Sequence, residues 1–184
     1  MAALPADVTR FWIAAGPQKW FAKSAAFDDA IRLKFEPVHH AAACGEYAGW
    51  TATAEGALAL VILLDQFPRN LYRDSAHAFA TDPLARHIAG QAIDAGLDAG
   101  VAAALRAFLY LPFEHSEILA DQERSVALFE AHDAETGDVD NLEWAVLHRD
   151  IIRRFGRFPH RNAQLGRVTT AEEQAFLDEG GFAG

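Results

Sequence analysis

The sequence predicts a single all-α domain, because both its composition and its helix start and stop signals favour helices. Of the 184 residues 51% are apolar, enough for a substantial core within one domain. Ala is abundant, Val, Ile and Thr are sparse, and no segment alternates polar and apolar residues as strands do. About eight helices joined by short loops account for residues 1–184.

The first helices are delimited by proline, glycine and N-cap residues. A helix over Asp7–Ala15 ends at the Gly-Pro pair that follows it. Ser24 caps the second helix, and Pro37 is expected to break it, with a short helix over His39–Ala43 beyond. Its buried face carries residues spaced four apart, namely Phe27, Ile31 and Phe35.

The middle of the chain carries three further helix signals. Thr53 opens a helix that runs to a Phe-Pro break at residues 67–68. Asp82 stands before a proline and is the expected N-cap of a helix ending near Ala95. The segment Val101–Leu111 is almost entirely apolar, which predicts the central helix of the domain, kinked or ended by the proline after it.

Two helices close the chain after a helix over Asp121–His132. Asp140 and Glu143 resemble a capping box and open a helix from Asn141 to about Phe155. The same pattern opens a last short helix before a glycine-rich tail; its two residues are Thr169 and Glu172.

Composition also excludes several classes of protein. A single cysteine, Cys44, excludes an internal disulfide and a multi-cysteine zinc site, and we expect it to be a small buried residue. The first residues lack a signal-peptide pattern, and the longest apolar run, residues 57–64, is too short to span a bilayer. We therefore expect a soluble cytoplasmic protein. The net charge of −10 argues against nucleic acid as a partner.

Three polar clusters interrupt the segments that should form the core. Residues 65–70 and 157–162 each place Arg-Asn just after Phe-Pro, and residues 111–117 form the third cluster. An unpaired buried charge costs several kcal/mol, so something in the interior must satisfy these groups. Codon bias alone can account for the excess of arginine over lysine. The concentration of arginine between residues 148 and 167 is harder to explain in that way and favours binding of a carboxylate or phosphate. We expect the three clusters to share one chamber walled by apolar helices.

Each cluster allows a structural and a functional interpretation. Asp65 extends an apolar helical stripe one turn before Arg69, either as a buried pair or as the wall of a cleft. His148 shares an apolar face with Trp144, either as a satisfied core residue or as a proton carrier. If a helix starts at Pro112, three carboxylates share one face and need cations; they belong to Glu114, Glu117 and Asp121.

Familiar catalytic and metal-binding motifs are missing. The sequence contains no HExxH, no pair of Glu-x-x-His motifs such as di-iron bundles use, and no phosphate-binding glycine loop, and Ser116 lacks a nucleophile-elbow sequence. We therefore predict no metal and no cofactor, and the sequence does not decide whether the protein is an enzyme.

Together these segments resemble a bacterial family known as domain of unknown function nine-two-four. The resemblance runs from Phe11 to Leu177 and is carried by residues 57–70, 78–82, 108–117, 120–123 and 148–162. It implies a tetratricopeptide-like fold of antiparallel helix pairs, and it implies no established activity or catalytic residues.

Two hypotheses about function remain. In the first, the protein binds a small anionic molecule, a carboxylate or phosphate, with His115 or His148 as proton carrier. In the second, it is a scaffold for a protein or peptide partner, with Trp20 or Trp50 as anchors and the polar clusters as internal struts. The candidate ligand-binding residues are Asp65, Arg69, Asn70, Glu114, His115, Glu117, Asp121, His148, Arg161 and Asn162.

Overall fold

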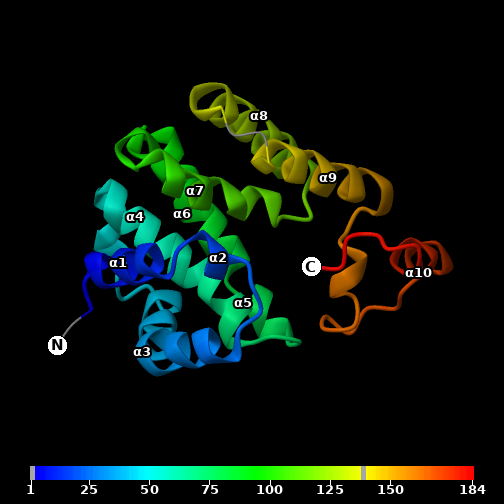
Figure 1. Ribbon diagram of the computed structural model, residues 1–184, viewed down its shortest axis with the longest axis horizontal. Coiled ribbons are helices and arrows are strands. Elements are labelled where there is room, and N and C mark those ends of the chain that lie inside the picture. Colours follow the sequence, from blue (N-terminus) through cyan, green and yellow to red (C-terminus); the bar gives the residue numbers. More distant parts are fainter. Residues whose placement is uncertain (1–2, 138–139) are drawn as a thin grey trace. The chain divides into compact units, whose positions relative to one another are not determined.

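The computed structural model describes residues 3–137 and 140–184, and within them the chain is helical without a strand (Figure 1). The chain divides into two compact units. The first contains residues up to Arg73 and His77–Pro112, and the second contains Asp74–Ala76 and Phe113–Gly184. The predicted all-α class is confirmed, whereas the single domain and the tetratricopeptide-like pairing stay predictions.

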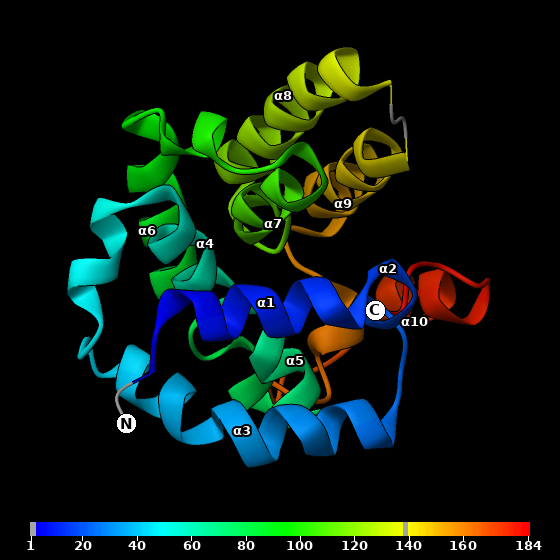
Figure 2. The same ribbon diagram turned by 60° about the vertical axis from the view of Figure 1, so that its left-hand side comes forward.

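The first unit is built around one continuously buried segment (Figure 2). Every residue of Gly56–Pro68 is buried, and α1 and α6 pack against its first part. The helices of this unit are α1 (Pro5–Ala15), α2 (Pro17–Trp20), α3 (Ala25–Ala43), α4 (Ala54–Val61), α5 (Phe67–Leu71), α6 (Asp82–Asp94) and most of α7 (Ala103–Glu114). A π-helical turn, η2 (Ile62–Gln66), joins α4 to α5, and the 3-10 segments are η1 (Ala48–Ala52), η3 (Ala76–Phe79) and η4 (Leu97–Gly100).

The prediction that Val101–Leu111 forms the central helix is wrong for its first half. Burial is continuous only from Phe108 onward, and residues 102–107 are half-buried or exposed. The central position belongs to η2 and to α4 from Gly56 onward, where every residue is buried. Pro112 does not end α7 at once, because the helix continues to Glu114.

Two close contacts explain why this centre holds together. Aromatic rings of three helices meet edge to face, with Trp12 5.4 Å from Phe108 and Phe11 5.0 Å from Phe35. A Cβ on Gly56 would lie 2.1 Å from the carbonyl oxygen of Trp50, so only glycine allows η1 to approach α4 this closely.

Pro37 does not break α3, contrary to expectation. The helix runs from Ala25 to Ala43 without interruption. Both Pro37 and Leu33, whose carbonyl loses its helical donor, lie on the exposed side, where water can bond that carbonyl. The opposite face is anchored by buried side chains, and it keeps the helix straight enough to continue.

The N-caps of α3 and α4 were predicted correctly, whereas α1 and α7 begin two residues away from the predicted positions. The side chains of Ser24 and Thr53 accept hydrogen bonds from the N–H groups of Phe27 and Gly56, as caps should. Asp82 lies inside α6, whose N-cap is Thr81.

The second capping box was also misplaced by one residue. It is formed by Thr170 and Glu173 rather than by Thr169 and Glu172. Residue 139, the N-cap position of α9, lies outside the described residues. Cys44 is exposed rather than buried, because it is the C-cap of α3 beyond the last buried turn.

The second unit consists of a helix hairpin and a shorter C-terminal part. The hairpin pairs α8 (Leu119–Thr136) with α9 (Asp140–Phe155), and η5 (Pro159–Arg161) and α10 (Ala171–Asp178) follow. Ile151, Ile152 and Phe158 form its buried apolar cluster, and Phe155, Phe176 and Phe182 pack against it. The face of α9 differs from the prediction, since Trp144 is 52% exposed while Ala145 and His148 are buried.

Across residues 3–137 and 140–184, no helix combines the length and the apolar character that crossing a membrane requires.

Candidate functional site

The first polar cluster is organised around the helix defect that Pro68 creates. Proline has no N–H, so the carbonyls of Leu63 and Leu64 lose the donors that a π- or α-helical turn would supply. Two side chains replace them. Nδ1 of His39 lies 2.8 Å from the oxygen of Leu63, and the Thr81 hydroxyl donates to the oxygen of Leu64 at 2.5 Å. Burial lowers the pKa of His39, which keeps its ring neutral and fit for this role.

Arg69 bridges two carboxylates at the same turn. Its guanidinium donates two hydrogen bonds of 3.1 Å to Asp82 and lies 3.4 Å from the carboxylate of Asp65, which is completely buried. It also donates to the backbone oxygen of Asp65. The predicted pairing of Asp65 with Arg69 is therefore present, and Asp82 is a partner that the sequence did not indicate.

Asn70 belongs to a third contact of the first unit. Its amide donates to Asp28 at 2.8 Å, and Arg73 donates to both oxygens of the same carboxylate at 2.6 and 2.9 Å. Burial alone would raise the pKa of Asp28, but the hydrogen bonds from Arg73 and Asn70 outweigh it and lower that pKa. The three predicted site residues of the first cluster, Asp65, Arg69 and Asn70, are thus all paired or hydrogen-bonded within the first unit.

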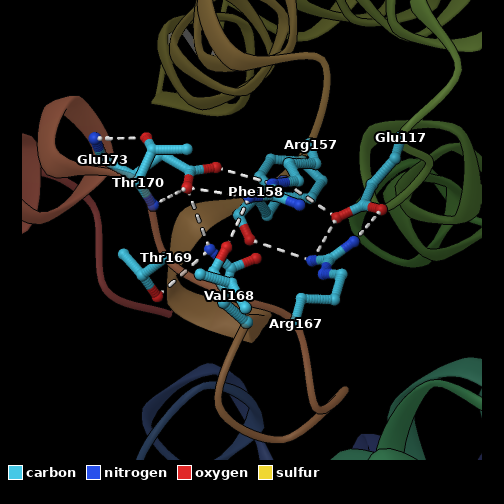
Figure 3. A network of polar contacts seen from close by, with 9 residues as sticks. Glu117, Arg157, Phe158, Arg167, Val168, Thr169, Thr170 and Glu173 are labelled. Atoms are coloured by element: carbon cyan, nitrogen blue, oxygen red, sulfur yellow. Dashed lines mark hydrogen bonds and ion pairs between the residues drawn. The ribbon is translucent and has the colours of Figure 1, made fainter.

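In the second unit, Glu117 holds the loop after α9 (Figure 3). Arg167 donates to its two oxygens at 2.7 and 3.0 Å, and the backbone N–H of Phe158 donates at 2.8 Å. Although burial raises the pKa of Glu117, these hydrogen bonds outweigh it and lower that pKa. The helix expected from Pro112 through Asp121 is absent, because α7 ends at Glu114 and α8 begins at Leu119. The three carboxylates therefore do not share a helical face.

Glu173 is the centre of the neighbouring network in Figure 3. It receives two hydrogen bonds from Arg157, at 2.6 and 2.9 Å, one from the backbone of Thr170 at 2.7 Å and one from the amide of Asn162 at 3.3 Å. The hydrogen bond from Arg157 is the main reason that the pKa of Glu173 falls to about 2. Glu173 was not a predicted site residue, and the capping box expected from the sequence used Glu172 in its place.

Gln122 and Asp121 secure the connection between α7 and α8. The amide of Gln122 donates to the backbone oxygens of Glu114 and Ser116, both at 2.6 Å, and so satisfies carbonyls at the end of α7. The hydroxyl of Ser116 donates to Asp121 at 2.6 Å. Gln122 was not among the predicted residues, because no sequence pattern marks the end of α7.

His148 and Glu114 form a different kind of contact in this unit. Both residues are buried, with exposed fractions of 6% and 4%. Nδ1 of His148 lies 2.8 Å from the backbone oxygen of Trp144 and 3.3 Å from Oε1 of Glu114. A histidine nitrogen between a carbonyl and a carboxylate is a proton donor, which assigns a proton to Nδ1.

Aromatic rings enclose this histidine. The centroid of Phe182 lies 4.5 Å from that of His148 and 5.1 Å from that of His160, both edge to face. Phe158 lies 5.4 Å from His148 and 5.6 Å from His160. We call Glu114, His148, Phe158, His160 and Phe182 the histidine site.

A buried cation adjoins the histidine site. The guanidinium of Arg161 lies over the ring of Phe158 at 4.5 Å and donates to the backbone oxygen of His115 at 3.0 Å. Of the ten predicted residues, seven belong to the second unit. The contacts above join Glu114 to His148 and Arg161 to His115, and they join Glu117 to the loop that carries Arg161. The other three belong to the first unit, so the single shared chamber stays a prediction.

Other features of the structure are weaker candidates for a functional site. An open depression of about 380 Å³ is lined by Arg154, Arg157, Glu172 and Glu173, whose charges pair with one another. Trp20 donates to the backbone of Trp12 and is half-buried, which limits it as an anchor. Among the described residues, no group of three or more His, Cys, Asp or Glu side chains is arranged to hold a metal ion.

The sequence profile of a bacterial family of proteins of unknown function, DUF924, matches residues 8–181. A solved structure of a protein of unknown function from Agrobacterium tumefaciens is 51% identical to the chain. The similarity covers 95% of this chain and 97% of that one, with a TM-score of 0.89. No curated protein matches the chain.

Proposed function

We propose that the chain, which belongs to the DUF924 family of bacterial proteins of unknown function, binds a small organic acid at the histidine site. The observation that carries the proposal is the buried imidazole of His148, whose Nδ1 faces two acceptors, one of them the carboxylate of Glu114. In many catalytic and ligand-binding sites, a carboxylate hydrogen-bonds one ring nitrogen of a histidine and so fixes the orientation of the ring.

The surroundings of His148 define the apolar part of the ligand. Phe182 already places a phenyl ring 4.5 Å from this imidazole, and Phe158 provides a second aromatic wall. A group of the size and shape of a phenyl ring would therefore fit beside His148 in the position that the ring of Phe182 now occupies. Aromatic rings also recognise each other beyond their buried area, by about 0.5–1.5 kcal/mol per pair.

The polar part of the ligand follows from the basic groups. His148 and His160 both line the site, and the guanidinium of Arg161 lies on the ring of Phe158. Imidazole N–H groups and guanidinium donors form charge-assisted hydrogen bonds with carboxylates. A carboxylate attached to an aromatic or bulky apolar group satisfies both requirements, with His148 as the residue that exchanges a proton with it.

A thermal-shift comparison tests this function with four probes: phenylacetate, benzyl alcohol, acetate and inorganic phosphate. We expect phenylacetate alone to raise the melting temperature in proportion to the logarithm of its concentration. The rise should disappear in His148→Gln and persist in His87→Gln, a matched control at an exposed histidine of the first unit. Equal responses to phenylacetate and acetate would contradict the proposal.

A second candidate function, a scaffold for a protein partner, is favoured by one observation. Asp65, Asn70 and Glu117 are each bonded to groups of their own unit, as internal struts would be. Under this function none of the four probes changes the melting temperature, while substitutions at the struts lower it. The probe comparison therefore distinguishes the two functions.

A further inference from the structure

The chain turns sharply after α10 and returns to the histidine site. Gly180 has a φ of +84°, its N–H donates to the oxygen of Leu177 at 3.1 Å, and the N–H of Gly181 donates to the oxygen of Phe176 at 2.9 Å. This is a Schellman motif, which fixes the direction in which the chain leaves the helix. A Cβ on Gly181 would lie 2.5 Å from that same oxygen, so the turn requires glycine at both positions.

Beyond the turn, apolar contacts hold the chain. Phe182 is half-buried and packs against the apolar cluster of the unit and against two histidines, with centroid distances of 4.5 Å to His148 and 5.1 Å to His160. Gly184 is exposed but lies near His160, since a Cβ on Gly184 would be 3.2 Å from that ring. For residues 182–184 of the described chain, no hydrogen bond accompanies these contacts. A segment held in this way can leave without breaking a polar network.

Phe182 also occupies the position that the proposed ligand needs. Its ring lies edge to face on both histidines of the site, and a phenyl group of a bound acid would make the same contacts. We propose that Gly180–Gly184 is a displaceable cover, in which Phe182 competes with the ligand for the histidine site. This inference rests on the proposed function and adds how access to the site is controlled.

The cover has a measurable consequence without any ligand. Diethyl pyrocarbonate acylates accessible imidazole nitrogens, and mass spectrometry of peptides locates the modified histidines. If the open form is a minor population, Phe182→Ala should raise the modification rates of His148 and His160 by at least about tenfold. Phe182→Leu, which keeps apolar bulk and supports folding, should give an intermediate rate. Val168→Ala, at an exposed residue of the same unit, should leave both rates unchanged.

Phenylacetate binding to the same variants, measured by calorimetry, separates this inference from the proposed function. A cover predicts that Phe182→Ala tightens binding by the same factor as it accelerates modification. Weaker binding in Phe182→Ala would show that the ring is a wall of the site and would overturn the cover, while the function would stand. Faster modification without phenylacetate binding to any variant would support the cover and contradict the function. Unchanged modification rates would overturn the cover directly.

Discussion

Nδ1 of His148 lies 3.3 Å from the carboxylate of Glu114. Both residues are buried, with exposed fractions of 6% for His148 and 4% for Glu114. The second unit holds another buried histidine–carboxylate pair, His132 and Asp133 at 3.3 Å, whose carboxylate also accepts the N–H of Leu142. What distinguishes His148 from His132 is its aromatic surroundings. Two phenyl rings lie 4.5 and 5.4 Å from the imidazole of His148, whereas Phe129 lies 6.5 Å from that of His132.

The clamp between Arg167 and Glu117 should stabilise the second unit. Arg167→Ala removes two charge-assisted hydrogen bonds to Glu117 and one to the oxygen of Phe158, so we expect the free energy of unfolding to fall by about 2 kcal/mol. Arg167→Lys should recover only part of it, because an ammonium cannot form the bidentate pair. Urea unfolding measures both effects. Arg153→Ala, at an exposed ion pair with Glu123, is the control and should change stability by less than about 1 kcal/mol.

Glu173 should make the protein lose stability in acid. Its pKa is lowered from 4.5 to about 2, so its contribution is complete above pH 4.5 and is lost as the pH falls towards 2. Melting temperatures across this range should therefore fall more steeply for the wild type than for Glu173→Gln, which has no charge to lose. Parallel curves for the two proteins would show that the Arg157 pair does not depend on ionised Glu173.

Pro68 and Thr81 should be energetically coupled. Thr81→Val leaves the carbonyl of Leu64 without its side-chain donor and should cost about 1–3 kcal/mol in unfolding free energy. In a Pro68→Ala background, the restored backbone N–H can serve that carbonyl, and the cost of Thr81→Val should shrink. A double-mutant cycle by denaturant unfolding measures the coupling. Additive effects would contradict our account of the π-helical turn.

Gly56 should be intolerant of a side chain. A Cβ there would lie 2.1 Å from the backbone oxygen of Trp50, and relief requires movement of η1, at about 1–3 kcal/mol or more. Gly49→Ala is the matched control, since a Cβ at Gly49 meets nothing within 4 Å. We expect a lower melting temperature for Gly56→Ala only. Equal melting temperatures would mean that η1 is not tightly fixed on α4.

Local sequence patterns predicted the helices well and their polar partners less well. The pair Asp65–Arg69 was predictable because a spacing of four residues places both side chains on one face of a helix. Glu117 meets Arg167, 50 positions later, and no local pattern specifies such a partner. The failure at Pro37 has the same origin, since the exposure of its helix face depends on tertiary packing.

The histidine site was predictable only in part. His148 and Glu114 were both candidates, but Glu114 was placed in the third polar cluster and His148 on an apolar helix face. Their contact was not predicted, because it depends on how α7 ends. His160 and Phe182 were not candidates as site residues. Phe182 lies in a glycine-rich tail, and only the turn at Gly180 and Gly181 directs it back to the histidines.

Long-range ¹H–¹⁵N NMR of the histidine side chains, with and without phenylacetate, tests the central claim most directly. It reports which ring nitrogen of each neutral histidine carries the proton. We predict the Nδ1–H form for His148 and a change in its signals, and in those of His160, when phenylacetate is added, while the signals of His87 stay fixed. An Nε2–H form of His148, or signals that phenylacetate leaves unchanged at saturation, would contradict the assignment of the histidine site.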